Sequence, residues 1–136
     1  MRVLVDTSVW ADFFNDHASR ERAALSELLR SDHDACTCGV IVAEVFQGLR
    51  RQRGRAAIER SFRDMILLEA EGIETYLRAA GLIRELRSRG HTIRSTIDCL
   101  IAVLADEGGC ALLARDRDLS AILESGLVDV RSWPAS

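Results

Sequence analysis

The chain has 136 residues, of which 48% are hydrophobic and 29% are charged. This length supports one domain with a hydrophobic core, and not two. Eighteen basic residues, all of them arginine, against 21 acidic ones give a net charge of −3, which gives no overall indication of nucleic-acid binding. No apolar run is long enough to cross a bilayer and the N-terminus lacks the pattern of a signal peptide, so we expect a cytoplasmic protein with no membrane partner.

The first ten residues contain a strand followed by a helix start. Residues 2–5 form a short apolar run without alternation, which predicts a buried strand. Asp6, Thr7 and Ser8 follow directly, and such short oxygen-bearing side chains are typical of a helix N-terminus because they accept hydrogen bonds from its free amides. We therefore expect Asp6 at the carboxyl end of a central strand, where open α/β sheets bind their ligands.

The rest of the chain alternates between helical spacing of apolar residues and short apolar runs of strand length. The expected elements are, in chain order, a helix over 20–30 capped by Ser19, a strand over 34–37, helices over 40–49 and 55–63, a strand over 66–68, helices over 72–89 and 96–107, a strand over 111–114, a helix over 119–124 and a last strand over 128–130. This order predicts an α/β fold, with a central, mostly parallel, twisted sheet of about five strands flanked by helices. No linker or repeat divides the chain, so residues 1–136 are expected to form a single domain.

The cysteines and histidines do not suggest a metal site of their own. Cys36, Cys38, Cys99 and Cys110 match neither the ligand spacing of zinc sites nor a disulfide framework. Free thiols packed as small apolar side chains are the better interpretation. The three histidines also lack metal-ligand spacing, and we expect them to be solvated.

Five carboxylates are expected to converge at one edge of the sheet, because helices that follow or precede parallel strands begin at the carboxyl edge. These residues are Asp6, Glu44, Asp98, Asp116 and Asp118. Glu44 and Asp98 stand beside apolar residues of their helices, which favours an inward orientation. Each carboxylate alone has a structural explanation, as a cap, an ion-pair partner or part of a solvated turn. Together they would repel one another unless protons or cations neutralise them.

A ligand set made only of carboxylate oxygens suits a hard cation, Mg²⁺ or Mn²⁺. Such an ion can activate a water and orient a phosphodiester. Thr7 and Ser8 are candidates to bind a phosphate near a helix N-terminus. The arginines that flank the acidic positions, Arg94, Arg115 and Arg117, are candidates to hold neighbouring phosphates, whereas the basic run 50–55 is better explained as a solvated helix end. The residues thus indicate metal-dependent chemistry on a phosphate ester.

At these residues the sequence resembles the PIN-domain ribonucleases, and in particular the VapC-type toxins of bacterial toxin–antitoxin pairs. The matching segments are Val5-Asp6-Thr7-Ser8-Val9-Trp10, Glu44 in its apolar helix, residues 92–102 around Asp98, and Ala114-Arg115-Asp116-Arg117-Asp118-Leu119. Their order and spacing agree over nearly the whole chain. The family often has a hydroxyl residue at the position of Ala114, a difference that affects a supporting hydrogen bond and not the metal site.

The resemblance implies a PIN fold with Asp6, Glu44, Asp98 and Asp116 as the catalytic acidic residues, all four also metal ligands. Asp118 matches a position that assists metal binding in similar toxins. It further implies Mg²⁺- or Mn²⁺-dependent endonucleolytic cleavage of structured RNA, with transfer RNA or ribosomal RNA as the expected substrate, by water attack on phosphorus. The implied partners are a second copy of the chain and a VapB-type antitoxin whose C-terminal segment blocks the site.

Two other functions remain open from the sequence. A haloacid-dehalogenase-like phosphatase also begins with a strand that ends in Asp, but it usually has a second acid two residues later, where this chain has Ser8, and it uses a lysine, which this chain lacks. A PIN-like module that binds RNA or protein without cleavage would be expected to lose some of the carboxylates. Metal-dependent activity discriminates between an enzyme and such a module.

Overall fold

The computed structural model describes residues 1–49 and 54–134 of the chain. The described residues contain one sheet of parallel strands in the order β3-β2-β1-β4, formed by β1 (Arg2–Val5), β2 (Asp34–Cys38), β3 (Ile66–Leu68) and β4 (Cys110–Leu113). The register pairs Leu4 with Cys36 on one side and with Leu112 on the other. Residues 3–5 of β1 are fully buried and all of β4 is buried, which is the burial expected of strands covered on both faces.

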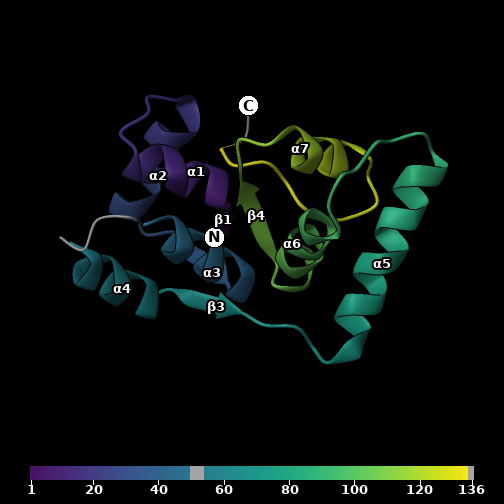
Figure 1. Cartoon of the computed structure of the whole chain (residues 1–136), viewed down its shortest axis with the longest axis horizontal. Coiled ribbons are helices and arrows are strands. Elements are labelled where there is room, and N and C mark those ends of the chain that lie inside the picture. The colour runs from purple at the N-terminus through teal and green to yellow at the C-terminus, as the bar shows by residue number, and fades with distance from the viewer. Residues whose placement is uncertain (50–53, 135–136) are drawn as a thin grey trace.

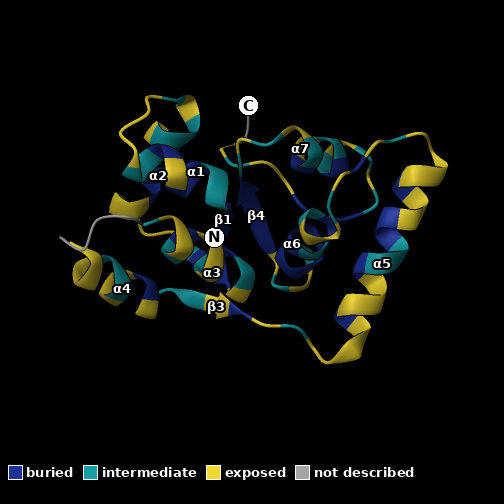
Figure 2. Ribbon diagram, viewed as in Figure 1, coloured by how far each residue is buried: buried dark blue, intermediate teal, exposed yellow. Residues whose placement is uncertain are grey.

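The helices cover this sheet on both sides (Figure 1). They are α1 (Thr7–Phe14), α2 (Arg20–Arg30), α3 (Gly39–Gly48), α4 (Arg55–Arg63), α5 (Ile73–Ser88), α6 (Thr96–Glu107) and α7 (Arg117–Glu124). In the view of Figure 1, α1 to α4 lie to the left of β4 and α5 to α7 lie to its right. Figure 2 shows the consequence for burial, since β1 and β4 are dark blue while the outer face of α5 is exposed. The predicted α/β fold with a parallel sheet is confirmed.

The predicted fifth strand is not formed, so the described sheet has four strands and not five. Val128 and Val130 are buried, at 7% and 8% exposure, but they belong to an irregular segment after α7. The chain meets β4 only at Ser132, in a single parallel bridge to Leu112. Alternating apolar residues predict that their side chains are buried. Here an irregular segment packed against the core buries them without forming a strand.

The ends of the helices follow the predicted capping chemistry. The Ser19 hydroxyl accepts a hydrogen bond from the Arg22 N–H at 3.0 Å and caps α2, and Ser95 caps α6 in the same way through the N–H of Ile97. Three helices begin within a few residues of a strand's carboxyl end: α1 after β1, α3 after β2 and α7 after β4. These helix starts therefore meet at one edge of the sheet.

The four cysteines are free and buried, as predicted for thiols packed as small apolar side chains. Cys36, Cys99 and Cys110 are each at most 4% exposed. They contribute to the core and not to the edge where the helices begin.

Candidate active site

Three carboxylates meet at the carboxyl edge of the sheet. Asp98 lies in the first turn of α6, Asp116 is the N-cap of α7 and Asp118 is in the first turn of α7. One carboxylate oxygen from each lies within 4.8 Å of the other two. The Asp116 Oδ1 accepts hydrogen bonds from the N–H groups of Asp118, at 2.8 Å, and Leu119, at 3.0 Å. These hydrogen bonds hold the Asp116 side chain in place, and its second carboxylate oxygen takes no part in the capping.

Asp6 is held beside this group from β1. Its side chain accepts hydrogen bonds from the Ser8 N–H at 3.1 Å and from the Ser8 hydroxyl at 2.6 Å. Asp6 is 6% exposed, and burial raises the pKa of its carboxyl, with the negative charge of Asp116 adding to the increase and the Ser8 hydrogen bonds opposing it. A buried carboxylate with two donors is placed with little freedom, as a metal ligand requires.

Glu44 reaches the edge from α3, but it differs from the sequence prediction. It was expected on the apolar face of its helix, and the structure places it on the exposed side. The Thr7 hydroxyl donates a hydrogen bond to Glu44 Oε1 at 3.3 Å. Partial burial of the carboxyl raises the pKa of Glu44, and the charge of Asp6 raises it further. Glu44 therefore belongs to the solvent-facing rim of the site.

The pKa of Asp98 is affected by all four of the other predicted acids. The pKa of Asp98 is raised from 3.8 to about 6, with burial as the largest cause, followed by the negative charges of Asp116, Asp6, Asp118 and Glu44 in that order. A carboxylate neutralised by an arginine would have its pKa lowered instead. The Asp98 carboxyl is therefore surrounded mainly by negative charge.

The predicted phosphate-binding residues fall into two groups. Three of them have partners outside the cluster of Asp98, Asp116 and Asp118: Thr7 donates to Glu44, Ser8 donates to Asp6, and the Arg115 guanidinium forms an ion pair with Asp12 at 2.7 Å. Arg94 and Arg117 are exposed beside the acids, and the Arg94 Nε lies 3.4 Å from an oxygen of Asp118. Most of the basic run, residues 50–53, lies outside the described residues.

Sequence reasoning missed one charged residue of this region, Asp12. It is buried, at 4% exposure, although it carries a carboxyl group. The signal was present in the sequence, because Asp12 stands between Trp10 and Phe13 on an otherwise apolar helix, and a carboxylate in such a position needs a partner.

The donor chemistry fits a hard divalent cation. All candidate ligands are carboxylate oxygens, three of them lie close together, and the charges of the other four acids contribute to the raised pKa of Asp98. Mg²⁺ and Mn²⁺ prefer oxygen ligands of this kind. The site could hold such an ion through Asp98, Asp116 and Asp118, with Asp6 adjacent.

Comparison with known proteins assigns the chain to a family. The model of the PIN domain matches residues 3–123. The chain belongs to the PIN-domain family. A VapC ribonuclease of Mycobacterium bovis and the ribonuclease VapC11 of Mycobacterium tuberculosis are each 31% identical to it over 121 residues, which is 88% of this chain and 90% of each relative. Within the PIN family, the chain is thus of the VapC type, and the dehalogenase-like alternative is set aside.

Solved structures of VapBC complexes and of a VapC toxin share the fold over nearly the whole chain. The VapBC-1 complex of nontypeable Haemophilus influenzae has a TM-score of 0.69 at 17% identity and covers 98% of both chains. The VapBC2 complex of Rickettsia felis, bound to a promoter DNA fragment, has a TM-score of 0.68 at 17% identity, covering 98% of this chain and 99% of the other. VapC20 of Mycobacterium tuberculosis, a toxin that cleaves the sarcin–ricin loop, has a TM-score of 0.62 at 23% identity and covers 95% and 98% of the two chains.

No helix in residues 1–49 and 54–134 combines the length and the apolar character needed to span a membrane.

Proposed function

We propose that this VapC-type PIN domain is a Mg²⁺- or Mn²⁺-dependent endoribonuclease, the toxin of a toxin–antitoxin pair. The observation that carries the proposal is the close approach of the Asp98, Asp116 and Asp118 carboxylates, within 4.8 Å of one another, at an edge where the pKa of Asp98 is raised to about 6. Such a concentration of negative charge is unfavourable without a cation. A binding site for one explains why the fold maintains it.

The chain's own residues have distinct roles in this proposal. Asp98, Asp116 and Asp118 hold the ion, and Asp6, fixed by its two hydrogen bonds from Ser8, completes the buried side of the ligand set. When bound, the ion supplies an activated water and stabilises negative charge on the phosphate oxygens. Glu44 has a raised pKa and a solvent-facing position, so we assign it to proton transfer at the rim.

The proposed substrate is a structured RNA, such as transfer RNA or ribosomal RNA. Arg94 and Arg117 are exposed beside the carboxylates, where their guanidinium groups can bind backbone phosphates in a bidentate manner. One structural relative, VapC20, is a toxin that cleaves the sarcin–ricin loop, which supports an RNA substrate of defined shape. The choice among such RNAs depends on surface shape and loop contacts.

The test is cleavage of a small-RNA pool by the purified chain, free of antitoxin, with Mg²⁺, with Mn²⁺ and with a chelator. We expect discrete fragments that require metal and disappear in Asp98→Asn. The matched control is Asp32→Asn, which makes the same chemical change at an exposed residue before β2. Metal-independent fragments, or fragments that persist in Asp98→Asn, would refute the mechanism. A folded chain that binds Mn²⁺ but cleaves no RNA would favour the non-catalytic binding module.

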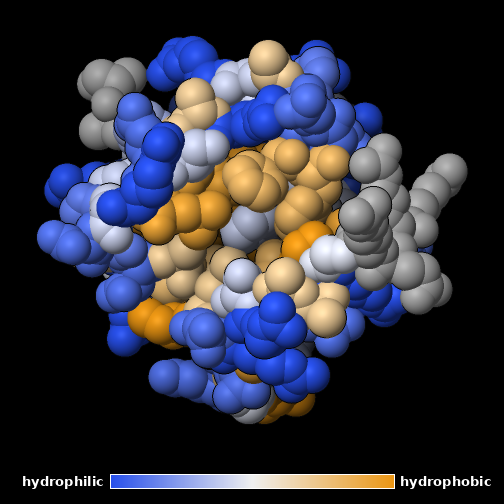
Figure 3. Space-filling view, turned by 90° about the vertical axis from the view of Figure 1, so that its left-hand side faces the viewer, coloured by the Kyte–Doolittle hydropathy of each residue, from blue (hydrophilic) through white to orange (hydrophobic). Residues whose placement is uncertain are grey.

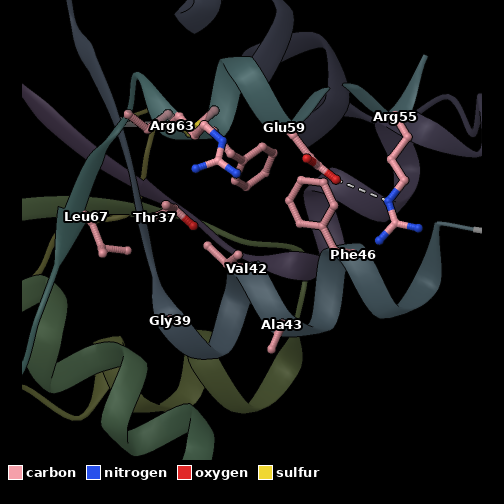
Figure 4. Close-up of a pocket in the computed structure, with 11 residues that line it drawn as sticks. Thr37, Gly39, Val42, Ala43, Phe46, Arg55, Glu59, Arg63 and Leu67 are labelled. Carbon is pink, nitrogen blue, oxygen red and sulfur yellow. Dashed lines mark ion pairs between the residues drawn. The ribbon is translucent and has the colours of Figure 1, made fainter. Parts of the chain in front are cut away.

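An apolar groove between α3, α4 and β3 is the proposed contact for the antitoxin. Figure 3 shows apolar residues around a hollow on the side of the molecule where α4 lies in Figure 1. A cavity of about 560 Å³ lies there between α3, α4 and β3, with Val42, Phe46, Phe62, Met65 and Leu67 among its lining residues. In Figure 4, Arg55 and Arg63 stand at its rim. An apolar groove of this kind is typical of a surface that binds another protein segment.

Two features of the groove indicate what kind of segment fits. The hydroxyl of Thr37, which is 1% exposed, lines the cavity and has no hydrogen-bond partner among the described residues. Arg55 pairs with Glu59, which also lines the cavity, at 3.3 Å, so Arg63 is the arginine that favours acidic residues on the partner. We therefore propose an amphipathic antitoxin segment with acidic flanks, in keeping with the VapBC complexes among the structural relatives. Arg63→Glu should weaken co-purification with a co-expressed antitoxin, whereas Arg84→Glu, on the exposed side of α5, should not.

The proposed homodimer needs a second apolar surface. Ile73, Tyr76 and Leu77 on α5 are 68%, 54% and 54% exposed. Large apolar side chains with this exposure are costly on an isolated chain and are typical of surfaces covered by a partner. We propose that a second copy covers the N-terminal half of α5.

A further inference from the structure

Asp12, outside the predicted set of acidic site residues, makes the best-formed ion pair of this region. Both of its oxygens accept hydrogen bonds from the Arg115 guanidinium, Oδ2 from Nε and Oδ1 from an Nη2 amino group, each at 2.7 Å. The Ser19 hydroxyl donates a third hydrogen bond, at 2.9 Å. These bonds hold the pKa of the Asp12 carboxyl below its usual range, with the Arg115 hydrogen bonds as the largest cause. The carboxylate stays charged although the residue is 4% exposed.

The partner residue, Arg115, belongs to the loop that carries a proposed metal ligand. It stands between the end of β4 at Leu113 and Asp116, which caps α7. Its backbone N–H donates a hydrogen bond to the Ser8 hydroxyl at 3.0 Å, and the same hydroxyl donates to Asp6 at 2.6 Å. The loop is therefore fixed at two points, by its backbone to Ser8 and by its side chain to Asp12. Both anchors, Ser8 and Asp12, lie on α1, and the residue that they hold, Arg115, directly precedes the proposed ligand Asp116 in the chain.

We propose that Asp12 and Arg115 are positioning residues of the metal site. The ion pair fixes the backbone at residue 115 and so places the Asp116 carboxylate against Asp98. It also turns the Arg115 guanidinium away from the acidic group, where it would compete with a cation for the same oxygens. The consequence for metal binding rests on the proposed function, but the placement of the loop does not.

This assignment differs from a phosphate-binding role for Arg115. A bidentate ion pair with a buried carboxylate already uses the face of the guanidinium that would bind a phosphate. A phosphate-binding arginine would mainly affect the KM for RNA, because it contacts substrate. A positioning pair instead affects kcat and the affinity for the metal. A change at Asp12 should then have the same effect as a change at Arg115, although the buried Asp12 has no access to RNA.

The experiment compares the wild-type chain with Asp12→Asn, Arg115→Gln and a matched control, Asp16→Asn. Asp16 is also paired with an arginine, Arg22, at 2.6 Å, but it is exposed and lies after the end of α1. Circular dichroism first confirms that each variant is folded. Arg115→Gln breaks the same ion pair from the other side. The Arg115 side chain is 47% exposed, so its replacement leaves the core intact.

The first readout is amide hydrogen exchange in the metal-free chain. We expect faster exchange at Arg115, Asp118 and Leu119 in Asp12→Asn and Arg115→Gln, and no change there in Asp16→Asn, because these amides donate to Ser8 and to the Asp116 cap. Unchanged exchange in both test variants would overturn the proposal, whether or not the chain binds metal.

The second readout is the dissociation constant for Mn²⁺, measured by calorimetry, together with kcat and KM. Both test variants should bind Mn²⁺ about 10-fold more weakly and lose a similar factor in kcat, with the KM for RNA nearly unchanged. Wild-type affinity in both variants would also overturn the proposal. If the wild-type chain itself binds no Mn²⁺, the proposed function fails, and the exchange data alone decide the positioning role.

Discussion

Asp98→Asn should make the metal-free protein more stable while it removes activity. Asp98 is surrounded by four other carboxyl groups, and burial and their charges raise its pKa to about 6. At neutral pH the ionised Asp98 carboxylate therefore lowers the stability of the folded chain. Asparagine has nearly the same shape and no charge, so the substitution removes this repulsion together with a metal ligand.

The magnitude follows from the shift in pKa. A shift from 3.8 to about 6 corresponds to roughly 3 kcal/mol at most, since one pKa unit equals about 1.4 kcal/mol. Asp98 is only partly buried, and solvent screening reduces the expected gain in the free energy of unfolding to about 1 kcal/mol. For a chain of this length, that corresponds to about 4 °C in Tm.

The pH dependence has a definite sign. The folded chain binds a proton at Asp98 below about pH 6, whereas the unfolded chain does so only below about pH 4, so the contribution of Asp98 to wild-type stability rises as the pH falls through this window. Raised pKa values at Asp6 and Glu44 act in the same direction. Asp98→Asn lacks the Asp98 contribution, and its advantage over wild type should shrink between pH 7.5 and pH 5.

The assay is thermal unfolding followed by circular dichroism, in chelator, at pH 7.5 and pH 5. Asp32→Asn controls for the loss of one negative charge at an exposed position. Added Mg²⁺ should raise the Tm of wild type and leave that of Asp98→Asn nearly unchanged, because a ligand stabilises only the state that binds it. An Asp98→Asn variant that melts at or below wild type at pH 7.5 would refute the argument from crowded carboxylates.

Other substitutions test the cap, the support of Asp6 and the dimer. Asp116→Ala removes the acceptor of two N–H groups and should cost about 1 kcal/mol of unfolding free energy. Asp116→Asn should keep most of that stability and lose activity. Equal stabilities of the two variants in urea unfolding would contradict the capping role. Ser8→Ala should cost about 1 to 2 kcal/mol and weaken Mn²⁺ binding in calorimetry, and wild-type values for both would show that Asp6 needs no such support. Leu77→Glu should shift the chain from dimer to monomer in light scattering, while Leu29→Glu, at an exposed apolar residue of α2, should not; a dimer that survives Leu77→Glu would exclude the α5 surface.

Local patterns of the sequence were enough to predict most of the fold. The apolar run before Asp6, the serine caps of α2 and α6, and the alternation of helices with short strands all depend on residues close together in the chain, and the structure has these elements nearly as expected. The fifth strand was wrong because an apolar pair such as Val128 and Val130 reports burial and does not specify a hydrogen-bonding partner.

The approach of the acids could be predicted in outline because a parallel sheet brings the carboxyl ends of its strands to one edge. Which acids lie within ligand distance, and how far each is buried, depends on packing between elements that are distant in the chain. Asp98, Asp116 and Asp118 therefore meet closely while Glu44 stays at the solvent-facing rim. The pairing of Asp12 with Arg115 joins residues 103 positions apart. No local pattern encodes such a contact, because it exists only once β1 and β4 lie side by side and bring the two residues within hydrogen-bonding distance.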